Sequence, residues 1–199
     1  MNRVLVYFFL GALALTVLYV LAVTVFSAAW NGVRAYWRSR GTRVVVCPET
    51  RRYVAVELDA AHAAATAGEE GGPELRLRAC TRWPERRDCD QDCVHQIENA
   101  PDGCAVRAML ADFYEGRTCA LCGHEVGEIH WHDHKPALLR LEDHRTFEWQ
   151  EIAPESLPEA LATHLPVCWN CHVAESFRLE HPELVLDRES KSAAAHAHR

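Results

Sequence analysis

The sequence predicts an α+β fold, in which an N-terminal transmembrane helix is followed by a small α+β domain stapled by metal. Three observations lead to this prediction. An uncharged run of 27 residues occupies positions 4–30 of the 199-residue chain. After it, short alternating segments typical of strands are interleaved with helical segments. Nine cysteines and twelve histidines then supply many metal ligands for so short a chain.

The apolar run at residues 4–30 predicts an uncleaved membrane anchor. About 20 apolar residues span the bilayer core as a helix, whereas the apolar region of a signal peptide is only about 7–15 residues long. The anchor and the basic helix expected to continue from it make up residues 1–42. We therefore expect the lipid bilayer to be one partner, contacted through residues 4–30.

The charges that flank the anchor predict its orientation. Only Arg3 precedes the apolar run, whereas four arginines follow it closely: Arg34, Arg38, Arg40 and Arg43. Because positive flanks stay in the cytoplasm, we expect a single-pass protein of the bacterial inner membrane with a cytoplasmic C-terminal domain. A reducing compartment favours metal sites over disulfides.

Residues 43–116 predict a small α+β module with a candidate second metal site. Strands are expected at 43–47, 53–59 and 74–80, and helices at 60–67, 90–100 and 102–114. Two of its cysteines end predicted strands and two lie one helical turn apart; the four are Cys47, Cys80, Cys89 and Cys93. They are candidate ligands of a second zinc ion, with an iron–sulfur cluster as the alternative. Cys104 is expected to be a small buried apolar residue.

Residues 117–187 predict a zinc module, and residues 188–199 a disordered tail. A hairpin is expected within residues 127–152 and a helix over residues 154–164, and a further helix follows Cys168. Two Cys-x2-Cys pairs flank 45 residues, and their members are Cys119, Cys122, Cys168 and Cys171. A two-residue spacer lets both thiolates of a pair reach one ion at about 2.3 Å. The four are therefore candidate ligands of one structural zinc ion.

The order of knuckle, hairpin and cysteine-bearing helix resembles a treble-clef zinc finger, specifically a degenerate form of the zinc-bound HNH endonucleases. Four parts follow the order of that family: the Cys119–Cys122 pair, Asp133-His134, the Cys168–Cys171 pair and His172. The resemblance implies a metal-dependent nuclease with His134 as general base and His172 as metal ligand. Pro136 lies one position earlier than the family pattern has it, and Thr163 stands where the family has Asn.

Two further patterns leave alternatives open. The motif Cys-Trp-Asn-Cys-His at residues 168–172 matches c-type haem attachment, with His172 as axial ligand, and implies a membrane-bound mono-haem electron-transfer protein. Haem attachment requires the periplasmic side, which the flanking arginines disfavour. His130, His132 and His134 alternate, so on a strand they would share one face, as metal ligands or as a solvated surface.

The whole soluble part resembles a group of uncharacterised single-pass bacterial membrane proteins, through the ordered motifs CPET, WPER, CALCG, GEIHW, HKPALL and CWNCH. Residues 44–199 contain 16 basic and 28 acidic residues, a net charge of −12, which disfavours binding to nucleic acid. A four-thiolate zinc site has no open coordination position for catalysis. We therefore expect a zinc-binding scaffold or accessory subunit beside a membrane protein partner, and not an enzyme.

Overall fold

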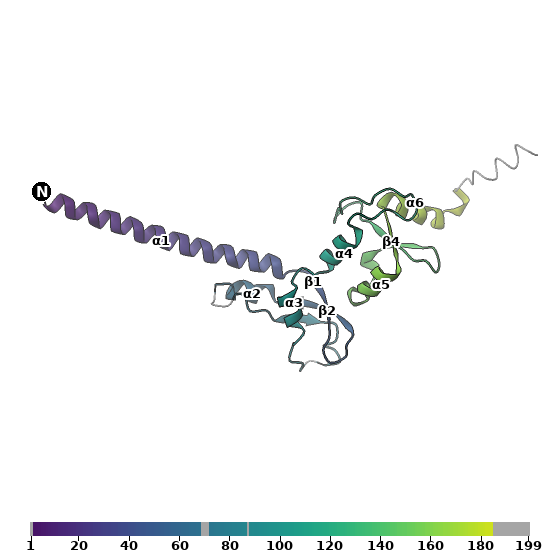
Figure 1. The fold of residues 1–199 in the computed structure, drawn as a ribbon, viewed down its shortest axis with the longest axis horizontal. Helices are drawn as coiled ribbons and strands as arrows, with labels where there is room; N and C mark the ends of the chain where they lie inside the picture. The colour runs from purple at the N-terminus through teal and green to yellow at the C-terminus, as the bar shows by residue number, and fades with distance from the viewer. Residues whose placement is uncertain (1, 69–71, 87, 185–199) are drawn as a thin grey trace, which may run out of the picture. The chain divides into compact units, whose positions relative to one another are not determined.

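The computed structural model describes residues 2–68, 72–86 and 88–184, so the predicted tail at 188–199 lies outside the described residues. The chain mixes helix and sheet, as predicted, and divides into two compact units, Met1–Ala105 and Val106–Arg199. Each unit contains one antiparallel sheet of three strands. Figure 1 shows the elements in chain order, from the long helix α1 at the N-terminus to α6.

Helix α1 (Asn2–Ser39) begins the first unit and confirms the predicted apolar N-terminal helix. An 18-residue window within its portion Tyr7–Ser39 has a mean hydropathy of 2.4, and in the described part of the chain this is the one helix long and apolar enough to cross a membrane. The large apolar side chains along it, from Tyr7 to Trp37, are exposed. An α-helix rises about 1.5 Å per residue, so the total length of α1 exceeds the thickness of the bilayer core.

The sheet of the first unit has the order β1-β2-β3, with β1 at Thr42–Val46, β2 at Tyr53–Leu58 and β3 at Leu77–Cys80. Helices α2 (Ala60–Thr66) and α3 (Val94–Asn99) complete the unit. The strands lie where alternation predicts them, although β3 is shorter than expected. Helix α3 begins four residues later than predicted, because Gln91 has a φ of 58° that no helix contains.

Helix α2 packs against the C-terminal part of α1 (Figure 1). Ala35 and Ala63 are buried in the first unit, and a Cβ added to Gly32 would lie 3.2 Å from the carbonyl oxygen of Ala64. The two backbones can therefore approach closely only because small residues line the contact. The α1 helix ends at Ser39, Gly41 follows it with a φ of 92°, and the buried Arg43 donates to the carbonyls of Arg38 and Arg40.

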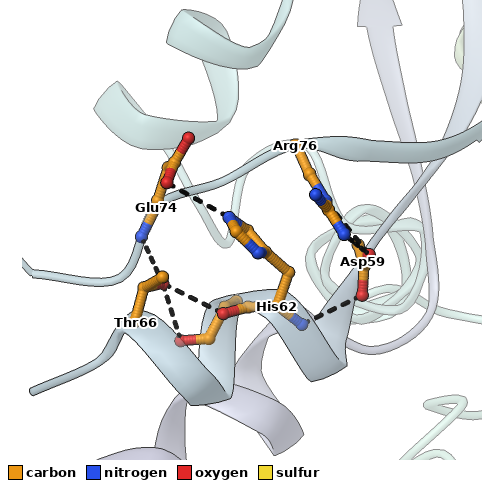
Figure 2. A network of polar contacts seen from close by, with 6 residues as sticks. Asp59, His62, Thr66, Glu74 and Arg76 are labelled. Atoms are coloured by element: carbon orange, nitrogen blue, oxygen red, sulfur yellow. Dashed lines mark hydrogen bonds and ion pairs between the residues drawn. The ribbon is translucent and has the colours of Figure 1, made fainter.

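A polar network holds α2 to the segment that leads into β3 (Figure 2). Asp59 caps α2 by accepting from the backbone N–H of His62 at 3.0 Å, and it also pairs with Arg76 at 2.7 Å. On the next turn, the hydroxyl of Thr66 accepts from the backbone N–H of Glu74 at 2.9 Å, while the Glu74 carboxylate lies 3.2 Å from the His62 ring. The network fixes the short helix that covers the end of α1.

The second unit is built around the sheet β5-β4-β6, with β4 (Ala137–Leu139) in the centre and β5 (Thr146–Glu148) and β6 (Leu165–Val167) on its edges. Its helices are α4 (Val106–Tyr114), α5 (Leu157–Thr163) and α6 (Trp169–Glu180), and 3-10 turns lie at Trp149–Glu151, Pro154–Ser156 and Pro182–Leu184. The hairpin and the last two helices lie where the sequence predicts them. Strand β6 is an element that the sequence analysis did not anticipate.

The predicted hairpin is much shorter than its sequence pattern, and this corrects the strand reading of the three alternating histidines. Residues 127–136 form turns and bends, so His130, His132 and His134 do not share a strand face. His134 has a φ of 50°, in the left-handed region that a strand does not contain. Helix α4 likewise begins at Val106, later than the predicted start at residue 102.

Candidate metal centre

The first cysteine pair lies on a tight turn at residues 119–124. The backbone N–H of Cys119 donates to the carbonyl of His124 at 2.7 Å, and the N–H of Gly123 donates back to Cys119 at 2.8 Å. Gly123 has a φ of 74°, which glycine adopts without strain. The sulfur of Cys119 accepts hydrogen bonds from the backbone N–H groups of Leu121 and Cys122. The turn therefore presents both thiols on one side of the loop, as a zinc knuckle does.

The second pair lies where β6 passes into α6. Cys168 is the N-cap residue of α6, and Cys171 lies in the first turn of that helix. Strand β6 brings this junction beside the knuckle, because the N–H of Ala120 donates to the carbonyl of Pro166 at 2.8 Å. The backbone N–H of Cys168 also donates to the sulfur of Cys119. The unexpected strand is thus the element that brings the two pairs together.

The four sulfurs of Cys119, Cys122, Cys168 and Cys171 all lie within 4.8 Å of one another. The sulfurs of Cys122 and Cys168 are 3.8 Å apart, which is the separation expected across a tetrahedral ion with metal–sulfur bonds of about 2.3 Å. Among the residues described, this is the one group of three or more metal-ligating side chains whose ligand atoms all lie within 4.8 Å of one another. The four cysteines lie close enough to bind one metal ion, and we call them the Cys119 cluster.

The pKa values of two thiols in the Cys119 cluster are shifted in opposite directions. Burial raises the pKa of Cys119, but backbone N–H groups from Cys168, Cys122 and Leu121 lower it more, to about 6. Burial and the neighbouring sulfurs instead raise the pKa of Cys171 well above that of an ordinary thiol. Four thiolates this close repel one another, and the attraction of each thiolate to a divalent cation at their centre would outweigh that repulsion.

The histidines that the HNH resemblance singles out lie beside the Cys119 cluster and do not belong to it. The Nδ1 atom of His172 lies 2.9 Å from the hydroxyl of Thr146 on β5. The ring of Trp169 contacts both His134 and His172, at centroid distances of 5.9 and 6.1 Å. The sequence did not predict the contacts of Trp169 and Thr146 with these histidines, because no spacing rule relates the two residues to the cysteines.

A cavity of about 220 Å³ lies next to these rings. Its lining includes His132, His134, Trp169 and the ion pair between Lys135 and Glu148, whose charged atoms are 3.5 Å apart. Both charges of this pair are therefore already matched within the lining, which leaves His132, Asp133 and His134 as its other polar groups.

The cysteines of the first unit are arranged differently. Cys47, Cys80, Cys89 and Cys93 line one cavity of about 50 Å³, although no three of their sulfurs lie within 4.8 Å of one another. Burial raises the pKa of Cys93 to about 11, and the thiols of Cys80, Cys89 and Cys47 add to that rise, which places all three near it. We call this site the Cys47 cavity. Cys104 is half-buried and its thiol faces the carbonyl of Gln96 at 3.7 Å.

Comparisons with known proteins add no relative to this picture. No protein-family model matches the chain, and neither the curated proteins nor the solved structures contain a significant match.

Proposed function

We propose that this chain is a membrane-anchored zinc protein of the bacterial inner membrane, which acts as a scaffold or accessory subunit of a membrane complex. The observation that carries the proposal is the Cys119 cluster, four sulfurs within 4.8 Å, in a chain whose first helix is long and apolar enough to span a bilayer. The two features together describe a small folded module that is held at a membrane.

Zinc is the metal that the chemistry of this ligand set favours. Four thiolates at tetrahedral distances are the usual ligands of structural zinc, and they leave no open position for water or substrate. The knuckle at residues 119–124, the β4–β5 hairpin and the two cysteines at the start of α6 support a treble-clef-like module. We therefore assign the ion a structural role, in which its binding energy stabilises a unit with a small apolar core.

The exposed face of α6 supports a binding role. No residue of α6 is buried, and Val173 and Phe177, one helical turn apart, are 44% and 48% exposed. The cationic flank after the apolar run favours a cytoplasmic location for the domain. A second protein in the same membrane, contacting this apolar face, is the partner that we propose.

The metal assignment is tested by elemental analysis and the visible spectrum of the full-length protein in detergent. We expect zinc, no haem or iron–sulfur absorption, and a loss of one zinc per chain in Cys168→Ser. Cys104→Ser is the matched control, because Cys104 lies outside both cysteine sites, and it should keep the wild-type zinc content. A Soret band, or full zinc content in Cys168→Ser, would contradict the proposal.

The orientation is tested by C-terminal fusions to two reporters. A fluorescent reporter that matures only in the cytoplasm should give signal, whereas a phosphatase that is active only in the periplasm should give none. The opposite result would place the domain outside the inner membrane and contradict the proposed location.

A further inference from the structure

The turn that carries Cys47 has the same backbone geometry as the turn that carries Cys119. At residues 47–52, the N–H of Cys47 donates to the carbonyl of Arg52 at 2.8 Å, and the N–H of Arg51 donates back to Cys47 at 2.8 Å. The fifth residue of the turn, Arg51, has a φ of 55°, as Gly123 has a φ of 74° in the other turn. The hydrogen bonds and the positive φ thus recur at matching positions.

The hydrogen bonds to sulfur recur as well. The sulfur of Cys47 accepts from the backbone N–H groups two and three residues later, at Glu49 and Thr50, as the sulfur of Cys119 accepts from Leu121 and Cys122. Thr50 occupies the position of Cys122, and its side chain is also hydrogen-bonded to the sulfur of Cys47. N–H groups that donate to a sulfur orient it as a metal ligand. The turn at residues 47–52 is therefore a zinc knuckle in which threonine replaces the second cysteine.

The other three cysteines of the Cys47 cavity come from separate elements. Cys80 ends β3, Cys93 immediately precedes α3, and Cys89 lies in the irregular segment between them. The cavity that they line with Cys47 has a volume of about 50 Å³, which is enough for an ion. No three of the four sulfurs lie within 4.8 Å of one another, so binding an ion requires them to move closer together, and Cys89 lies outside any helix or strand.

One arginine directly contacts a sulfur of the Cys47 cavity, whose lining contains two arginines and three acidic residues. A zinc ion with four thiolates carries a net charge of −2. Arg82 and Arg86 both line the cavity, and the guanidinium of Arg82 donates to the sulfur of Cys47 at 3.2 Å. Glu49 pairs with both arginines and holds them over the site. Charge-assisted hydrogen bonds of this kind stabilise a metal-bound thiolate.

We propose that Cys47, Cys80, Cys89 and Cys93 bind a second zinc ion, in a closed structural site that is independent of the Cys119 cluster. Binding releases the thiol protons to solvent and leaves a ZnS4 centre of charge −2. The ion joins the β1–β2 turn, the end of β3 and the start of α3, all within the unit that follows the membrane helix.

The test is the zinc stoichiometry of the full-length protein, measured with four variants. We expect two zinc ions per chain in the wild type and in Cys104→Ser, one in Cys89→Ser, one in Cys122→Ser, and none in the double variant Cys89→Ser/Cys122→Ser. Cys89 is chosen because its irregular segment tolerates substitution better than a strand end. One zinc in the wild type, two in Cys89→Ser, iron in place of zinc, or a disulfide among these cysteines would overturn the proposal.

A rescue variant tests the equivalence of the two turns. Thr50→Cys restores a Cys-x2-Cys knuckle, so adding it to Cys89→Ser should return the zinc content from one to two ions per chain. Glu49→Cys, which places a thiol one position earlier, should not restore the second ion. Failure of Thr50→Cys to rescue, or equal rescue by Glu49→Cys, would contradict the assignment of this turn as a ligand knuckle.

The outcomes separate this proposal from the proposed function. If the wild type binds one zinc ion, and Cys122→Ser loses it while Cys89→Ser keeps it, the Cys119 site is supported and the second site is contradicted. A wild type with one zinc that behaves in the opposite way would overturn the Cys119 assignment and keep the Cys47 cavity as a site.

Discussion

The hydroxyl of Tyr114 donates a hydrogen bond of 2.9 Å to the carbonyl oxygen of Ala137, and both residues are almost completely buried. The bond joins the last turn of α4 to the central strand β4. Burial raises the pKa of Tyr114 far above its ordinary value, so the phenol stays a neutral donor. Because β4 pairs with β6, which leads into Cys168, this bond supports the strand that positions the second cysteine pair.

Tyr114→Phe should lower the unfolding free energy of the second unit by about 1–3 kcal/mol, because it leaves a buried carbonyl without its donor. The zinc content should not change, because the ligands are intact. Chemical denaturation in detergent measures the loss, with Tyr53→Phe at an exposed tyrosine as the control. An unchanged stability in Tyr114→Phe would show that water replaces the phenol.

His172→Ala should leave the zinc content of the Cys119 cluster unchanged. The imidazole lies against Trp169 and the hydroxyl of Thr146, and it is not among the four clustered ligands. Metal analysis of purified His172→Ala, beside Cys171→Ser as the positive control for loss, gives the answer. Loss of metal in both variants would favour an HNH-type or haem site in place of four-thiolate zinc.

Gly32→Leu should push α2 away from α1, because the new Cβ would lie 3.2 Å from the backbone carbonyl of Ala64, which is closer than an ordinary contact. Overpacking of this kind destabilises by about 1–3 kcal/mol. Limited proteolysis near residues 60–66 should become faster. Gly11→Leu is the matched control, because no atom lies within 4 Å of its Cβ position. Equal proteolysis of both variants would contradict the close contact.

The stability of α2 should fall as the pH is lowered into the acid range. The N–H of His62 and the side chain of Arg76 hold the pKa of Asp59 below its ordinary value. A carboxylate with a lowered folded pKa stabilises the fold above its unfolded pKa of about 4, and this stabilisation is lost as the pH falls through the folded value.

Amide hydrogen exchange of α2 peptides measures this loss, with Asp59→Asn as the control. The asparagine still caps the helix but does not titrate, so the pH dependence of exchange in α2 should become shallower. The comparison is needed because acid would also protonate cysteine thiolates at the proposed metal sites. The same pH dependence in both proteins would show that Asp59 does not stabilise α2.

Local features of the sequence account for what could be predicted. The alternation at β1 and β2 and the Cys-x2-Cys spacing at Cys119 act over a few residues, so they can be recognised without the fold. Strand β6 has only three residues and contains Pro166, so no periodicity marks it. The knuckle at Cys47 is hidden in the same way, because Thr50 stands where a second cysteine would reveal the pattern.

Two residues, Arg40 and Gly41, separate the end of α1 from the first strand, and the side chain of Arg43 secures that junction. A domain tethered by a flexible linker can move over a distance of about several nanometres from the bilayer. No such tether lies between α1 and β1, so a bilayer that held α1 would also hold the first sheet at a fixed height. A partner fixed in the same membrane would then have to present its contact surface at that height.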